Sequence, residues 1–375
     1  ASGDVKDIEA EFSLARRMPI NGADQLAAEE VHDIVDGDMT EPRGALGRGN
    51  PTNRHTECTD CHNPHRVMRN AGFNGTGSPA LSAHEHASGH TNIASGALRG
   101  SWGVEPVYGD STFLSLPTSY EVKAGDGGIG ASDAVTSPHM TREYQVCLKC
   151  HSDYGYDDDN IYPIGTRPNL GSSGGGTAPG TNGLDQYSNQ AMEFQAPIAD
   201  QGEPGGNHRS WHPVMESTQR SAAVRNMSAS TNMFLPPWQG ANIGTQTMYC
   251  SDCHGRNTAL DTVEPPGGLP WGPHGSENDF LLKGSWSQTT GTTPDGICFR
   301  CHNHPNYATE TNEGDRGGFE SGFGGPEDTN LHAMHAKRLD RNLQCSWCHV
   351  AVPHGWKNKA LLVNLNDVGP EAGLA

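Results

Sequence analysis

Five short runs of the chain share one pattern, in which two cysteines three positions apart are followed at once by a histidine. They span residues 58–62, 147–151, 250–254, 298–302 and 345–349, and we number them motifs 1 to 5 in chain order. Two thiols at this spacing can add to the two vinyl groups of one porphyrin while the histidine binds its iron, as in c-type haem attachment. The sequence therefore predicts five covalently bound haems, with iron as the metal.

Every cysteine of the chain lies in one of these motifs, so none remains for a disulfide. The predicted haem-attaching residues are Cys58, Cys61, Cys147, Cys150, Cys250, Cys253, Cys298, Cys301, Cys345 and Cys348. The predicted proximal iron ligands are His62, His151, His254, His302 and His349. Structural zinc is the alternative for paired cysteines, but it needs four ligands and gives no reason for a histidine after every pair. The repeated histidine favours haem.

The remaining histidines are sufficient to give every iron a second axial ligand. The chain has 19 histidines, so 14 remain after the five in the motifs. Our first candidates for distal ligands are His65, His212, His274, His335 and His354, followed by His139, His332, His90 and His208. The segment from His349 to His354 is short and contains a proline, so we expect His354 to serve a different iron from His349. Iron held by two histidines has no open position, which predicts electron transfer and no enzymatic activity.

Three other features carry weaker signals. His32 is interpreted as a surface or packing residue, with an axial ligand as the alternative. His84, His86 and His90 form a cluster that supplies at least one ligand or belongs to a solvated loop. The three aspartates at 157–159 resemble a calcium site, since calcium prefers clustered carboxylate oxygens, but a solvated acidic loop is the favoured interpretation.

The composition indicates how these residues are held in place. Only 33% of the residues are hydrophobic, and the chain contains 48 Gly and 25 Pro, a balance typical of long irregular segments. Burying about 400 Å² of each porphyrin at about 25 cal/mol per Å² would contribute on the order of 10 kcal/mol as an upper estimate. We therefore predict mostly irregular coil with short α-helices and few short β-strands, organised around a chain of covalently bound haems.

The expected elements are correspondingly short. Residues 112–116 and 120–123 have β-like patterns, and His332 and His335 lie three apart on an expected helix. Residues 171–183 have the Gly/Ser-rich composition of a linker. We therefore expect an N-terminal two-haem region (1–170), this connection, and a C-terminal three-haem region (184–375).

Charge and hydropathy restrict the partners and the location. The formal net charge of −19 disfavours nucleic acid, which requires a basic surface, and is compatible with basic redox proteins and metal oxides. No run of eighteen apolar residues is present, so we expect no membrane span. The first residues resemble a mature start left by cleavage and carry no cysteine for a lipid anchor. We expect an exported protein, extracellular or at the cell surface, with the periplasm as the alternative.

The chain resembles the extracellular multihaem c-type cytochromes of metal-respiring bacteria. The resemblance rests on the five motifs, His-Pro-Val at 212–214, Gly-Pro-His-Gly-Ser at 272–276, the histidines at 332 and 335, and Pro-His-Gly-Trp at 353–356. It is closest over residues 207–368. It implies long-range electron transfer in a homopolymeric conductive filament, or nanowire, and His65 is similar in position to a ligand that reaches into the neighbouring subunit.

Three other functions remain alternatives to a filament. A monomeric exported electron carrier is the nearest one. A multihaem reductase with one open haem site is disfavoured, since no motif carries lysine in place of its histidine. A purely structural or adhesive role does not account for five haem motifs.

Overall fold

The structure is a computed structural model. It describes residues 8–12, 32, 56–68, 92–109, 116–155, 190–195, 208–221, 233–239, 242–266, 269–285, 294–307, 321, 323, 330–338, 345, 348–349 and 353–362. The predicted connection at 171–183 lies outside the described residues, and so do His84, His86, His90 and residues 157–159.

Regular secondary structure comes in short pieces joined by irregular chain. The helices are α1 (Ile8–Phe12), α2 (Cys58–Cys61), α3 (Glu143–Cys147), α4 (Gln190–Glu193), α5 (His304–Tyr307) and α6 (Leu331–Arg338). Single 3-10 turns are η1 (Gly96–Leu98), η4 (Cys250–Asp252), η5 (Asp279–Leu281), η6 (Ile297–Arg300) and η9 (Lys359–Leu361). The strands are β1 (Gly103–Val107), β2 (Ser119–Lys123), β3 (His208–Trp211) and β4 (Gly355–Asn358). The predicted irregular fold with short helices and few strands is confirmed.

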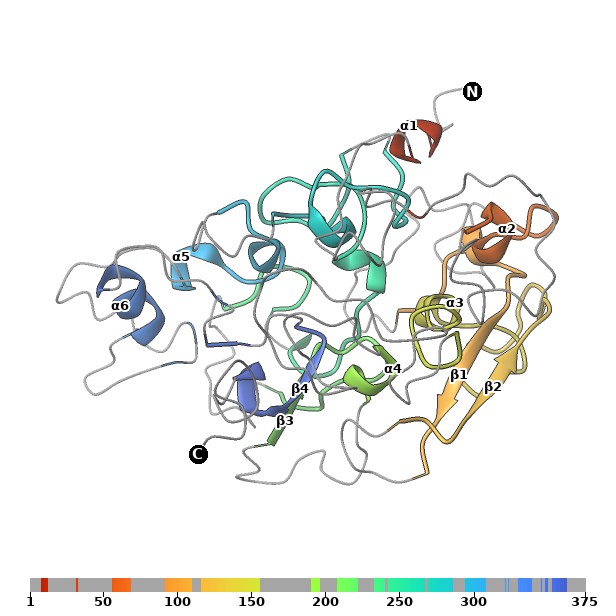
Figure 1. Cartoon of the computed structure of the whole chain (residues 1–375), viewed down its shortest axis with the longest axis horizontal. Helices are drawn as coiled ribbons and strands as arrows, with labels where there is room; N and C mark the ends of the chain where they lie inside the picture. Colours follow the sequence, from red (N-terminus) through yellow and green to blue (C-terminus); the bar gives the residue numbers. More distant parts are fainter. Residues whose placement is uncertain are drawn as a thin grey trace, which may run out of the picture.

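Two of the expected elements are found. The β-like segment 120–123 lies within β2, and both His332 and His335 lie on α6. The other β-like segment, 112–116, lies outside the described residues except for residue 116. Figure 1 shows α2 and the β1–β2 pair toward one end of the molecule and α5 and α6 toward the other.

The strands form two antiparallel pairs, β1 with β2 and β3 with β4. In the first pair, Gly103 in β1 lies directly against α3, because a Cβ added to Gly103 would come within 2.6 Å of the Gln145 carbonyl. In the second pair, Ser210 is opposite Trp356. This pairing brings together distant parts of the chain, and the His212 N–H donates to the His354 carbonyl at 2.9 Å.

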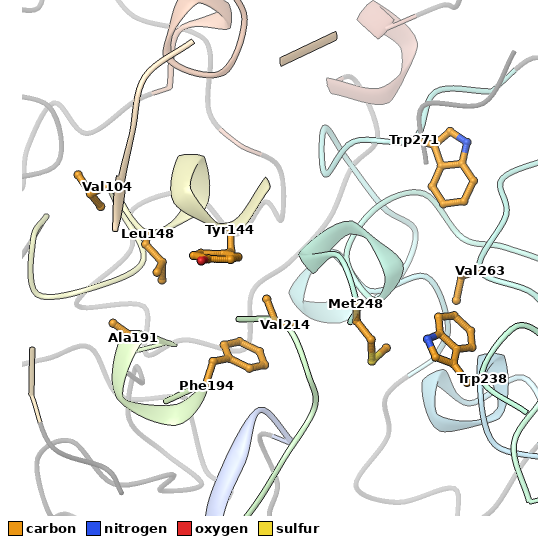
Figure 2. Close-up of a cluster of buried hydrophobic side chains, with 10 residues drawn as sticks. All are labelled: Val104, Tyr144, Leu148, Ala191, Phe194, Val214, Trp238, Met248, Val263 and Trp271. Carbon is orange, nitrogen blue, oxygen red and sulfur yellow. The ribbon is translucent and has the colours of Figure 1, made fainter. Parts of the chain in front are cut away.

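A cluster of buried apolar side chains joins the described segments. Its members are Val104, Tyr144, Leu148, Ala191, Phe194, Val214, Trp238, Met248, Val263 and Trp271. Figure 2 shows a group around α3 and α4 and a second group around Trp271, with Val214 and Met248 between them. The motif residues Cys250, Cys253 and Cys301 pack against this cluster. The cluster therefore includes residues from both sides of the predicted connection.

None of the described helices has the length and apolar character needed to cross a membrane, which agrees with the expected absence of a span.

Candidate metal centres

All five motifs share one backbone hydrogen bond. In each one the histidine N–H donates to the carbonyl of the first cysteine, at 2.9 Å in motifs 1, 2, 4 and 5 and at 3.0 Å in motif 3. This bond closes one helical turn, and residues four apart in such a turn lie on the same side. The motif sequence therefore folds locally into a turn that presents the first thiol and the imidazole together.

Four of the five motif histidines face a histidine from elsewhere in the chain. The ring centroids are 6.1 Å apart for His32 and His151, 6.3 Å for His62 and His274, 6.3 Å for His254 and His354, and 6.2 Å for His332 and His349. Each pair joins one motif histidine to one histidine outside the motifs. Seven of the eight residues in these pairs are predicted ligands, whereas His32 was interpreted as a surface or packing residue, with an axial ligand as the alternative.

The spacing of these pairs fits a metal ion held between two imidazoles. With metal–nitrogen bonds of about 2.0 Å on both sides, the centroids of two imidazoles bound to one ion lie about 6.2 Å apart. The observed range of 6.1–6.3 Å agrees with this value in all four pairs. The residues present therefore fit an iron with two axial histidines at motifs 1, 2, 3 and 5.

Hydrogen bonds at Nδ1 leave Nε2 as the ligand atom. Backbone carbonyls accept from Nδ1 of His62, His254, His349 and His32, at 2.8, 2.9, 2.7 and 2.7 Å. Nδ1 of His332 is bonded to the Ser321 hydroxyl at 2.8 Å. A carbonyl only accepts, so Nδ1 carries the proton and the lone pair is on Nε2, as in the outer shell of metal-bound histidines.

Burial keeps two of the paired imidazoles, those of His254 and His332, neutral. Burial lowers the pKa of His254 to about 4, and the neighbouring His354 adds to the effect. Burial also lowers the pKa of His332 to about 4, with a further contribution from His349. A metal binds only the unprotonated imidazole, so these rings are in the binding form at neutral pH.

Two of the non-motif histidines hydrogen-bond to buried carboxylates. Nδ1 of His274 lies 3.2 Å from Glu11 Oε2, and Nδ1 of His354 lies 2.7 Å from Glu193 Oε2. Both glutamates are fully buried. A carboxylate at this position fixes the tautomer and makes the imidazole a stronger donor to a metal. Neither glutamate was among the predicted site residues, because nothing in their local sequence indicates a distant histidine.

Three predicted site residues are buried or half-buried and lie outside the four pairs. The His302 ring contacts the rings of Phe234 and Tyr307, with centroids 5.0 and 5.2 Å away. His212 donates from Nδ1 to the Pro353 carbonyl. His139 is buried with its ring against Gly127, where an added Cβ would lie 2.4 Å from His139 Cε1. These contacts do not identify a distal histidine for motif 4.

Two other predicted ligands are exposed. His65 lies on a turn directly after motif 1, and its N–H donates to Asn63 Oδ1 at 3.1 Å. His335 donates from Nδ1 to the Leu331 carbonyl of its own helix and stacks on Phe323 with centroids 5.8 Å apart. The side chain of His208, on β3, lies outside the description.

Successive motifs are neighbours in space. The Cys147 thiol is hydrogen-bonded to the Cys250 thiol of the next motif, which together with burial raises the pKa of Cys147. The same contact joins Cys298 to Cys345. Burial raises the pKa of Cys301, and Cys253 of the preceding motif adds to this effect. Motifs 2 to 5 therefore follow one another in chain order.

Motif 1 also lies next to motif 2. Burial raises the pKa of the Cys61 thiol to about 12, and the thiols of Cys147 and Cys150 contribute to this rise. The Lys149 ammonium donates to the Asp60 carbonyl and lies 4.4 Å from the centre of the Trp102 ring. A buried lysine within motif 2 therefore contacts the backbone of motif 1.

The contact between motifs 2 and 3 also forms a cluster of metal-ligand type. One ligand atom each of Glu143, Cys147 and Cys250 lies within 4.8 Å of the others, and among the described residues this is the one group of at least three such side chains. Glu143 already accepts from the N–H and the hydroxyl of Ser251. Three ligands are one fewer than structural zinc requires.

No family model, curated protein or solved structure matches this chain, so its function is inferred from the motifs and their geometry.

Proposed function

We propose that this chain is an exported multihaem c-type cytochrome that binds five haems covalently and transfers electrons between them. The observation that carries the proposal is the set of four imidazole pairs at 6.1–6.3 Å, each of which joins a Cys-x-x-Cys-His motif to a distant histidine. Unrelated surface histidines would have no reason to face the motif histidines at the separation of two axial ligands.

The residues of the chain would perform three tasks. The motif cysteines attach the cofactor, and the paired imidazoles hold the iron from both sides. Bound haem supplies reversible one-electron exchange at its iron. With two imidazoles holding each iron, no position would remain for a substrate, and the contacts between successive motifs support transfer in the order of the chain.

Haem quantification tests this proposal. The full-length chain, produced in cells that carry the c-type haem attachment machinery, is expected to contain five haems that survive denaturation, with low-spin spectra at motifs 1, 2, 3 and 5. A mutant with alanine at Cys58 and Cys61 provides the control and should contain four. Protein that binds zinc and no covalent haem would contradict the proposal, and carbon monoxide binding at one of the paired sites would favour a reductase.

A second candidate is the polymeric form of the same function. The observation that favours it is the exposed position of His65 on the turn after motif 1. In some members of the group that the chain resembles, one histidine of each subunit binds a haem of the next subunit, and His65 is similar in position to that histidine. Four pairs account for motifs 1, 2, 3 and 5, so His65 would serve motif 4 of a neighbouring copy.

Electron microscopy of the purified protein separates the filament from a monomeric carrier. If copies in the filament share His65 as a ligand, His65→Ala is expected to abolish assembly and to leave one haem five-coordinate. Arg66→Ala is the matched control, because Arg66 is the adjacent residue and its side chain is 59% exposed. Filaments that persist in His65→Ala with all haems low-spin would exclude a shared His65 ligand, and dispersed particles of the unmodified protein would favour the monomeric carrier.

A further inference from the structure

The first four motifs form two equivalent pairs, as their inner residues show. Motif 1 is Cys-Thr-Asp-Cys-His and motif 3 is Cys-Ser-Asp-Cys-His. In motif 1 Asp60 Oδ2 accepts the Glu57 N–H at 2.9 Å, and in motif 3 Asp252 Oδ2 accepts the Tyr249 N–H at 2.9 Å. The aspartate caps the motif turn in both, so motifs 1 and 3 are built alike.

Motifs 2 and 4 are alike in a different way. Each has an apolar and then a basic inner residue, Leu148 and Lys149 in motif 2 and Phe299 and Arg300 in motif 4, and all four are buried. Motif 5 has Ser-Trp at these positions and fits neither type. The chain therefore reads as a two-motif unit used twice, motifs 1 and 2 and then motifs 3 and 4.

The two distal histidines of the first unit, His274 and His32, are held in place by one set of hydrogen-bonded residues. His274 lies in Pro-His-Gly at 273–275, its Nδ1 is bonded to Glu11, and Phe12 packs on its ring at 5.5 Å. The carbonyl of Pro273 accepts from Nδ1 of a second histidine, His32, at 2.7 Å. The two imidazoles serve the two motifs of the unit, His274 facing motif 1 and His32 facing motif 2.

The second unit repeats this arrangement with different segments. His354 lies in Pro-His-Gly at 353–355, its Nδ1 is bonded to Glu193, and Phe194 packs on its ring at 4.7 Å. The carbonyl of Pro353 accepts from Nδ1 of a second histidine, His212. Pro-His-Gly and Glu-Phe each occur twice in the chain, and both copies of each are used here.

We infer that His212 is the distal ligand of motif 4 and completes its iron opposite His302. This inference rests on the proposed function. His354 faces motif 3 as His274 faces motif 1. His212 donates to the residue before His354, just as His32 donates to the residue before His274. His32 faces the second motif of the first unit, so we assign His212 to the second motif of its own unit, motif 4.

Two further observations agree with this assignment. Val214, two residues after His212, belongs to the buried cluster against which Cys301 of motif 4 packs. The junction that follows each unit is also the same, because motif 2 meets motif 3 through a thiol contact and motif 4 meets motif 5 through the equivalent one.

The assignment has a consequence for assembly. With His212 at motif 4, each of the five irons has both axial histidines within one chain. No iron then remains for His65, so a filament would assemble without a shared ligand.

The test uses the full-length, haem-loaded protein. His212→Ala is expected to convert one of five haems to a high-spin form that binds carbon monoxide. Adding Cys298→Ala and Cys301→Ala, which remove the haem of motif 4, should leave four haems that are all low-spin. His32→Ala combined with the same two cysteine changes is the matched control and should retain one high-spin haem.

Other outcomes overturn the inference. They are five low-spin haems in His212→Ala, or a high-spin haem that persists after motif 4 is removed. If instead His65→Ala produces one high-spin haem, and this haem is lost when Cys298→Ala and Cys301→Ala are added, the motif 4 ligand lies in a neighbouring copy. If His212→Ala does not fold, His212→Met provides the test. Methionine can still bind the iron, and methionine ligation raises the reduction potential, so the potential of one haem should rise. Unchanged potentials in His212→Met would overturn the inference. Absence of covalent haem from the unmodified protein would instead overturn the proposed function.

Discussion

The non-motif imidazoles differ in what accepts their Nδ1 proton. For His274 and His354 the acceptor is the buried carboxylate of Glu11 or Glu193, whereas His32 donates to the Pro273 carbonyl. A carboxylate shifts electron density toward Nε2 and stabilises the oxidised metal more than a neutral acceptor does. Because both glutamates are fully buried, water does not screen this effect. The sites at motifs 1 and 3 should therefore have the lower reduction potentials.

Glu193→Gln tests this at motif 3. Glutamine keeps the size and the acceptor oxygen but removes the charge. A charge-assisted hydrogen bond exceeds a neutral one by about 1 kcal/mol, so the potential of one haem should rise by about 40 mV. Spectroelectrochemical titration measures the change. Glu105→Gln is the matched control, because this half-buried carboxylate accepts hydrogen bonds from the side chains of Tyr144 and Gln145. Equal potentials in the Glu193→Gln and unmodified proteins would show that the carboxylate only positions the ring.

The two histidines of α6 should have unequal roles. The sequence led us to expect that both would present an imidazole to an iron, but His332 faces His349 whereas His335 is exposed and stacks on Phe323. His332→Ala should therefore convert the haem of motif 5 to a high-spin form, and His335→Ala should leave all haems low-spin. Electron paramagnetic resonance distinguishes the two forms. A high-spin signal in His335→Ala alone would reverse the assignment.

Residue types and spacing nominate the motif half of each proposed site, but only part of the distal half. The motif residues follow from a local pattern that any reader of the sequence can find. His32 carries no such pattern, and its relation to motif 2 exists only because residues 32 and 151 meet in space. The same holds for Glu11, which lies 263 positions from His274. Tertiary packing determines contacts at such separations, and local sequence patterns do not predict them.

Among the elements, α3 depends most directly on one small residue. Its last residue is Cys147 of motif 2, and its backbone lies against Gly103 of β1. Gly103→Ala would place a Cβ within 2.6 Å of the Gln145 carbonyl, where backbone cannot move aside as a side chain can. The substitution should lower the free energy of unfolding by about 1–3 kcal/mol.

The effect of Gly103→Ala can be read from the midpoint of guanidinium denaturation, followed by circular dichroism. Val122→Ala is the control on the paired strand, because Val122 is 49% exposed and its truncation should change the free energy by less than about 0.5 kcal/mol. Equal midpoints for the two mutants would mean that α3 can shift away from β1 without loss of packing.

Element types were easier to predict than their pairing. Composition predicts short elements, and these are found; the helical turn of each motif was not predicted and comes from the structure. The pairing of β3 with β4 joins residues 210 and 356, which no turn or short loop connects. That pairing sets His212 beside His354, so the sequence could nominate both histidines without showing that they belong together.

At the scale of the molecule, the apolar core that the described residues form is small. Its main cluster in the described part of the chain has ten buried residues, and motif cysteines pack against its edge. Within the ranges that the structure describes, few regular elements are present to satisfy the backbone or to bury further apolar surface. A porphyrin at each motif would supply the missing apolar surface, so folding should be coupled to haem attachment.

This coupling predicts that the chain without haem is largely unfolded. Produced in cells that lack the attachment machinery, it should show coil-like circular dichroism and be digested by protease at least tenfold faster than the haem-loaded protein. The dependence should also be graded along the chain. Removing the haem of motif 3 with Cys250→Ala and Cys253→Ala should accelerate digestion more than Cys345→Ala and Cys348→Ala, because the first pair packs against the buried cluster while Cys348 is exposed. A protease-resistant haem-free chain would mean that the polypeptide folds without haem and that the haems attach to a protein that is already folded.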